Sequence, residues 1–165
     1  FFVERDGRWG SAMFLFYFLC VLLFLGLCRL VQPPHKGVFV TPGIIFVCIL
    51  HFVAMMAGGS SMQFERSGRN PMLGPSSEVL IQWGAQTMDL IRAGEYERLI
   101  TSMFVHGGLV HLGMNSMSLW NLGSQWERRF GGWRLLVLYM TSGLFASLAT
   151  AIVLPGAVCV GASGA

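Results

Sequence analysis

The charged residues of this chain are gathered into a few short stretches, and this grouping leaves four long segments with no charge. These uncharged segments are 9–28, 37–64, 99–126 and 135–165. A helix needs about 20 mostly apolar residues to cross the hydrocarbon core of a bilayer, and each segment is long enough. A buried helix of a soluble domain is the alternative for any one segment, but four such segments favour an integral membrane protein.

The composition supports the same class. Hydrophobic residues make up 54% of the chain and charged residues only 12%, whereas soluble domains carry roughly 25% charged residues. The net charge of +3 is small, and no basic run resembles a nucleic-acid-binding face, so we expect no nucleic-acid partner. The four cysteines lie in or beside apolar segments without metal-binding spacing, and we expect no metal and no cofactor.

Prolines, glycines and charges divide the chain into expected helices. Residues 1–39 form an N-terminal segment, in which 11–28 is interpreted as an additional transmembrane helix, or else as an interfacial segment. Pro33 and Pro34 end it within a short basic linker. From residue 40 onward we expect spanning helices at about 41–57, 103–122 and 135–154, and the start of another at 163.

Between the second and third expected helices, residues 58–101 hold most of the remaining acidic residues and four arginines. This stretch is predicted to be a long loop outside the membrane, and long ordered loops tend to be functional. Within it, the apolar residues of 77–94 recur at helical spacing. We therefore expect an amphipathic helix lying at the membrane interface there.

Basic residues orient the expected helices. Arg128, Arg129 and Arg134 cluster in the predicted turn 127–134, and the basic linker lies two crossings earlier. Because positively charged loops stay in the cytoplasm, both are predicted to be cytoplasmic. The loop 58–101 and the end of the chain then lie on the external face.

Polar side chains inside a spanning helix are costly and commonly functional. His111 and Asn115 are one turn apart, about 40° around the helix, so they share a face. His106 is about 140° from His111 and is predicted to lie at the loop edge, where it cannot complete a metal site. The alternative is that His111 and Asn115 only hydrogen-bond neighbouring helices.

The chain ends on "GASGA", a serine surrounded by the smallest residues. Bare backbone around Ser163 lets a carbonyl approach, and the free N–H groups of a helix start can bind an oxyanion. The alternative is that these small residues serve only close helix packing. Taken together with His111 and Asn115, Ser163 predicts hydrolysis of a peptide bond at membrane level. Neither His106 nor His111 can be assigned as the base.

These residues resemble the rhomboid family of intramembrane serine proteases. The similarity covers roughly residues 40–165, which we interpret as a partial rhomboid core. It is carried by "WGA" at 83–85, "GEYERLITSMFVHGGLVHLGMNSMSLW" at 94–120, "GSQWERRFG" at 123–131 and "GASGA" at 161–165. The resemblance implies a six-helix core that cleaves substrate transmembrane helices with a Ser–His dyad.

The resemblance also implies a role for each matching position. Ser163 matches the nucleophile, and His111 and Asn115 match the residues that stabilise the oxyanion. The other matching residues are the loop-edge His106, the loop arginine Arg98, the motif glycines Gly161 and Gly164, and Glu127 with Arg129 as a structural pair at the cytoplasmic end of the helix.

The sequence departs from the family pattern in two ways. Glu97 stands where the family usually has the tryptophan before the loop arginine. The family's general-base histidine lies on the sixth core helix, beyond Ala165. We therefore expect an all-α, polytopic transmembrane helix bundle of rhomboid type, truncated after the start of the serine-bearing helix, and expect this chain by itself to be inactive.

The resulting functional prediction is a serine endopeptidase that cleaves transmembrane protein substrates in the lipid bilayer. The alternative is a rhomboid-like pseudoprotease that binds membrane-protein clients without cleaving them. A channel or transporter lined by His111 and Asn115 is less favoured, because ion paths use acidic residues that the expected spans lack.

Overall fold

The structure is a computed structural model that describes Leu19 and residues 37–58 and 72–162. The expected helix at 11–28 therefore lies outside the described residues except for Leu19. Ser163 and Gly164 also lie outside them, as do residues 59–71 of the long loop.

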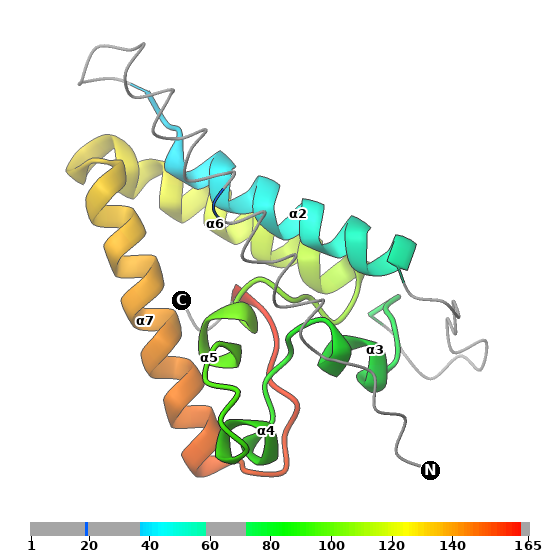
Figure 1. Cartoon of the computed structure of the whole chain (residues 1–165). Helices are drawn as coiled ribbons and strands as arrows, with labels where there is room; N and C mark the ends of the chain where they lie inside the picture. Colours follow the sequence, from blue (N-terminus) through cyan, green and yellow to red (C-terminus); the bar gives the residue numbers. More distant parts are fainter. Residues whose placement is uncertain (1–18, 20–36, 59–71, 163–165) are drawn as a thin grey trace.

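The described part of the chain is helical, and no strand forms in it. Its elements are α2 (Val40–Gly58), α3 (Ser77–Gln82), α4 (Met88–Arg92), α5 (Arg98–Thr101), α6 (Leu109–Phe130) and α7 (Gly132–Val153). Figure 1 shows α2 and α6 side by side, with α7 leaving the end of α6 at an angle. The short helices α3, α4 and α5 lie at the open side between α6 and α7.

A hydrophobic core joins the long helices to the loop. Phe104, which follows α5, packs against Tyr139 of α7 with ring centroids 5.9 Å apart. The core also draws on α2, α3 and α6, so it fixes the loop onto all three long helices. Its buried members are Ile44, Val47, Cys48, Phe52, Met55, Leu80, Ala85, Met103, Phe104, Val105, Leu112 and Tyr139.

Glu127 of α6 binds the amino-terminal end of α2. Its Oε1 accepts hydrogen bonds from the backbone N–H groups of Phe39 and Val40 at 2.8 and 2.7 Å. Its Oε2 accepts from the N–H and the Oγ1 of Thr41, both at 2.8 Å. The first N–H groups of a helix have no partner within the helix, and a carboxylate there also suits the helix dipole.

The expected pairing of Glu127 with Arg129 is therefore not what the structure shows. Both carboxylate oxygens are used by α2, whereas the guanidinium carbon of Arg129 lies 5.5 Å from the centre of the Phe130 ring. The physical reason is burial. Glu127 is 4% exposed and faces unpaired donors, while Arg129 remains exposed on the outer face of α6.

The bounds of α6 differ from the expected 103–122. The helix begins at Leu109, because the residues before it form turns whose apolar side chains enter the core as a loop. It continues to Phe130, so the expected turn at 127–134 contracts to Gly131, whose φ of 92° reverses the chain before α7. Glycine adopts this left-handed region without strain.

The expected amphipathic helix over 77–94 is broken into α3 and α4. Gly84 has a φ of 101°, which ends the helical path, and the next two residues are buried. The N–H of Ala85 still donates to the carbonyl of Leu80 at 2.9 Å, but Gln86 pairs its backbone with Cys159 as an antiparallel bridge. Tertiary contacts with the end of the chain therefore replace helical continuation.

Candidate active site

The structure brings Gly161 against the two polar residues of α6. Gly161 has a φ of 104°, and a Cβ added to it would lie 2.7 Å from Nε2 of His111 and 3.2 Å from Nδ2 of Asn115. Only a glycine fits this backbone at this distance. Three residues predicted from the sequence to belong to one site thus meet, two positions before Ser163.

His111 and Asn115 both present hydrogen-bond donors at this point. The N–H of Gly107 donates to Nδ1 of His111 at 3.4 Å, so the neutral imidazole carries its proton on Nε2, the atom nearest Gly161. The Nδ2 of Asn115 is buried and has no hydrogen-bond partner among the described residues. Two hydrogen-bond donors close to one point can together stabilise a developing oxyanion.

His106 lies beside His111, with ring centroids 5.3 Å apart. The helical angle of about 140° does not apply between them, because residues 102–108 precede α6 and are not helical. His106 is fully buried, and its Nδ1 donates to the carbonyl of Phe104 at 3.0 Å. Burial lowers the pKa of His106 to about 4, so its ring is neutral at physiological pH.

Arg98 fixes the loop that precedes α6. Its Nη1 donates to the carbonyls of Ile81 and Ala85 at 2.6 and 2.8 Å, and its Nε donates to Glu95 at 2.6 Å. Arg98 is 2% exposed, so its charge is balanced by these acceptors inside the protein. Glu97 is exposed and does not prevent this docking.

Metal binding is not supported within the described residues. In residues 37–58 and 72–162, no three His, Cys, Asp or Glu side chains lie close enough together to hold an ion. His106 and His111 are adjacent, but no third such side chain joins them in these ranges.

Two further residues, Gln86 and Ser102, hold the returning segment 155–162, which runs from the end of α7 back toward α6 (Figure 1). Gln86 exchanges two backbone hydrogen bonds with Cys159, and the carbonyl of Ser102 accepts from the N–H of Gly161 at 2.9 Å. The hydroxyls of Ser102 and Ser147 lie 3.4 Å apart. Sequence reasoning missed these residues, since single serines and a loop glutamine carry no pattern.

The described fold and site define a class of protein. The helices α2 and α7 are each long and apolar enough to cross a membrane, and both carry large apolar side chains on exposed faces. Together with the polar site between α6 and the returning segment, this indicates an all-α membrane protein with a buried polar centre.

Comparison with known proteins agrees with this class. Residues 93–165 match the Rhomboid domain. RHOMBOID-like protein 4 of Arabidopsis thaliana is 40% identical over 103 residues, covering 62% of this chain and 26% of the relative. Rhomboid protease GluP of Bacillus subtilis is 38% identical over 90 residues, covering 54% and 18%. Rhomboid-like protease 2 of Toxoplasma gondii is 35% identical over 111 residues, covering 67% and 37%.

Residues 93–165 of the chain thus belong to the rhomboid family. The matches span about a third or less of the length of most of these relatives. Membership of this family and the two apolar helices together indicate an integral membrane protein.

Proposed function

We propose that this chain is the part of an intramembrane serine protease that carries the nucleophile and the oxyanion donors. One observation supports the proposal above all: the contact of Gly161 with Nε2 of His111 and Nδ2 of Asn115. Ser163 follows two residues later. A serine two residues after a glycine that contacts two hydrogen-bond donors fits acyl transfer.

In the proposed reaction the hydroxyl of Ser163 attacks the carbonyl carbon of a substrate peptide bond. The carbonyl oxygen becomes an oxyanion, which accepts hydrogen bonds from His111 and Asn115. A base takes the serine proton and delivers it to the leaving amine, and water then hydrolyses the acyl-enzyme with the same base. The family resemblance assigns that base to a histidine outside residues 1–165.

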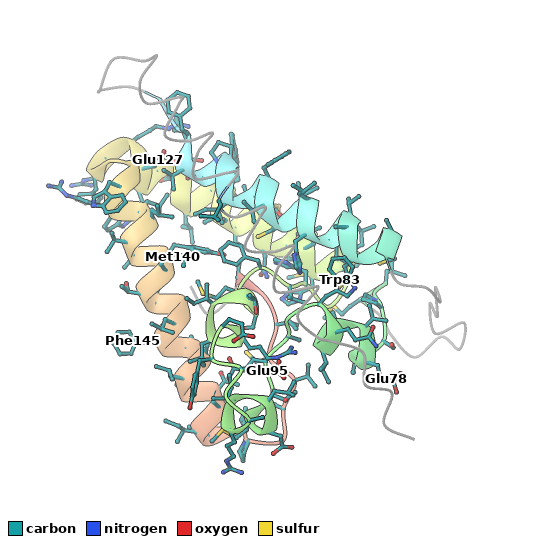
Figure 2. All side chains as sticks on the ribbon, viewed as in Figure 1. Glu78, Trp83, Glu95, Glu127, Met140 and Phe145 are labelled. Atoms are coloured by element: carbon teal, nitrogen blue, oxygen red, sulfur yellow. The ribbon has the colours of Figure 1, made fainter. Side chains whose placement is uncertain are left out.

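The proposed substrates are transmembrane segments of other membrane proteins, reached from within the bilayer. Figure 2 supports the proposed orientation: Glu127 lies near the junction of α6 and α7, whereas Glu78, Trp83 and Glu95 lie toward the opposite end of these helices. The arginine-rich junction is proposed to be cytoplasmic. The loop and the site would then open toward the external face.

The test is cleavage of a transmembrane substrate by the full-length protein in liposomes. Ser163→Ala should abolish cleavage without changing the unfolding temperature, while Ser118→Ala, an exposed serine of α6, should leave the rate unchanged. Undiminished cleavage by Ser163→Ala would rule out the assignment. A folded wild-type protein that binds membrane clients but never cleaves them would point to the pseudoprotease instead.

A further inference from the structure

The returning segment is positioned by backbone hydrogen bonds from the loop. The N–H of Gln86 donates to the carbonyl of Cys159 at 3.1 Å, and the N–H of Cys159 donates back at 2.9 Å. Two residues later, Gly161 donates to the carbonyl of Ser102. Val160 between them packs against the core. The segment's distance from α6 is therefore set by the loop to which it is bonded.

Gln86 is itself anchored from a second direction. It is 1% exposed, and its Nε2 donates to the carbonyl of Ser147, in the last third of α7, at 2.8 Å. The two residues before it are held as well: Thr101 donates to the carbonyl of Gly84, and Arg98 donates to that of Ala85, both at 2.8 Å. The glutamine thus links the fixed loop, α7 and the returning segment.

The side-chain hydrogen bond of Gln86 can be removed without disrupting the fold. A carbonyl inside a helix also accepts the N–H four residues later, so the carbonyl of Ser147 keeps a hydrogen bond when the glutamine amide is removed. The backbone bridge to Cys159 does not depend on side-chain identity. An apolar residue of similar size at position 86 should therefore fold while losing only the anchor on α7.

We propose that Gln86 is a positioning residue for the active site. Anchored on Ser147, it holds the segment that ends at Gly161 at its contact distance from His111 and Asn115, two residues before Ser163 in the sequence. This inference rests on the proposed protease function. Its physical basis is that oxyanion donors act only at about 3 Å, and a displacement of about 1 Å can cost roughly 100-fold in rate.

The test compares Gln86→Leu with wild type in the full-length protein in liposomes. We expect kcat to fall about tenfold with KM unchanged within about twofold, and the labelling rate of Ser163 by a fluorophosphonate probe to fall by a similar factor. Gln82→Leu makes the same change on the exposed face of α3 and should behave as wild type. A rise in KM alone, or unchanged labelling, would overturn the proposal.

Gln86→Glu should restore the hydrogen bond to Ser147, and with it cleavage, only at low pH. Burial raises the pKa of a carboxyl group, and the protonated acid can donate to the carbonyl of Ser147 as the amide does. Cleavage by this variant should approach wild type at low pH and fall as the pH rises through that pKa. The wild-type profile should lack this step. A variant profile parallel to that of wild type would contradict the anchoring role.

Hydrogen exchange measures the anchor without catalysis. The amides of Cys159 and Gly161 should exchange about tenfold faster in Gln86→Leu than in wild type or Gln82→Leu. Equal exchange would refute the proposal even if activity fell. If wild type neither labels nor cleaves, the protease assignment is wrong and the positioning of Ser163 falls with it. If wild type is active and Gln86→Leu matches it, only the positioning proposal is wrong.

Discussion

Glutamine in place of Glu127 should destabilise the packing of α2 on α6 by about 3 kcal/mol. The carboxylate accepts four hydrogen bonds, two on each oxygen, from Phe39, Val40 and Thr41. An amide keeps one oxygen and turns an N–H group toward the two remaining donors. Hydrogen bonds to charged groups contribute about 1.5–3 kcal/mol each, and relaxation of the helix end recovers part of the loss.

The measurement is the free energy of unfolding in detergent micelles, followed by circular dichroism during denaturant titration. Glu97→Gln makes the same chemical change at an exposed residue whose side chain forms no capping hydrogen bond, so it should cost little. Equal stabilities of Glu127→Gln, Glu97→Gln and wild type would refute the reasoning.

A double-mutant cycle assigns the effect to particular atoms. Thr41→Val removes the Oγ1 donor but keeps the backbone N–H. The backbone N–H and the Oγ1 of Thr41 bind the same oxygen of Glu127. The losses of unfolding free energy caused by Glu127→Gln and Thr41→Val should therefore be non-additive by about 1 kcal/mol. Additive losses would mean that the destabilisation arises elsewhere on α6.

Three further predictions concern the site and its orientation. Gly161→Ala should lower kcat for substrate cleavage by about 100-fold, because the methyl group would press on His111 and the backbone is left-handed; an active variant would show that this contact is not required. His106, whose pKa is lowered to about 4, favours the unfolded state as it takes up a proton, so stability should fall as the pH drops below about 6.5. His106→Phe should reduce this dependence in thermal unfolding at pH 7 and 5. Cysteines placed at Arg134 and Gly156, both exposed, should react with impermeant reagents from opposite sides of the membrane; labelling from one side would refute the orientation.

The local part of the site follows from helical periodicity. His111 and Asn115 lie inside α6, so the spacing of four residues placed them on one face, where the structure has them. The helix α2 likewise differs from the expected 41–57 by one residue at each end. Both results depend only on regular geometry within one helix.

The long-range part does not follow from any sequence pattern. Met103 and Phe104 are as apolar as residues of a spanning helix, but they enter the core from turns, so α6 begins six residues later than expected. The partners of Gln86 lie on α7 and on the returning segment. Pairings between residues this far apart are set by tertiary packing, which periodicity within one segment does not encode.

The bond between Glu127 and the start of α2 also bears on how the protein is made. Thr41 and Glu127 are 86 residues apart, which a ribosome translates in roughly 4–17 s at about 5–20 residues per second. During that interval the first N–H groups of α2 lack their carboxylate partner. This end of α2 therefore reaches its final packing only after α6 has been synthesised.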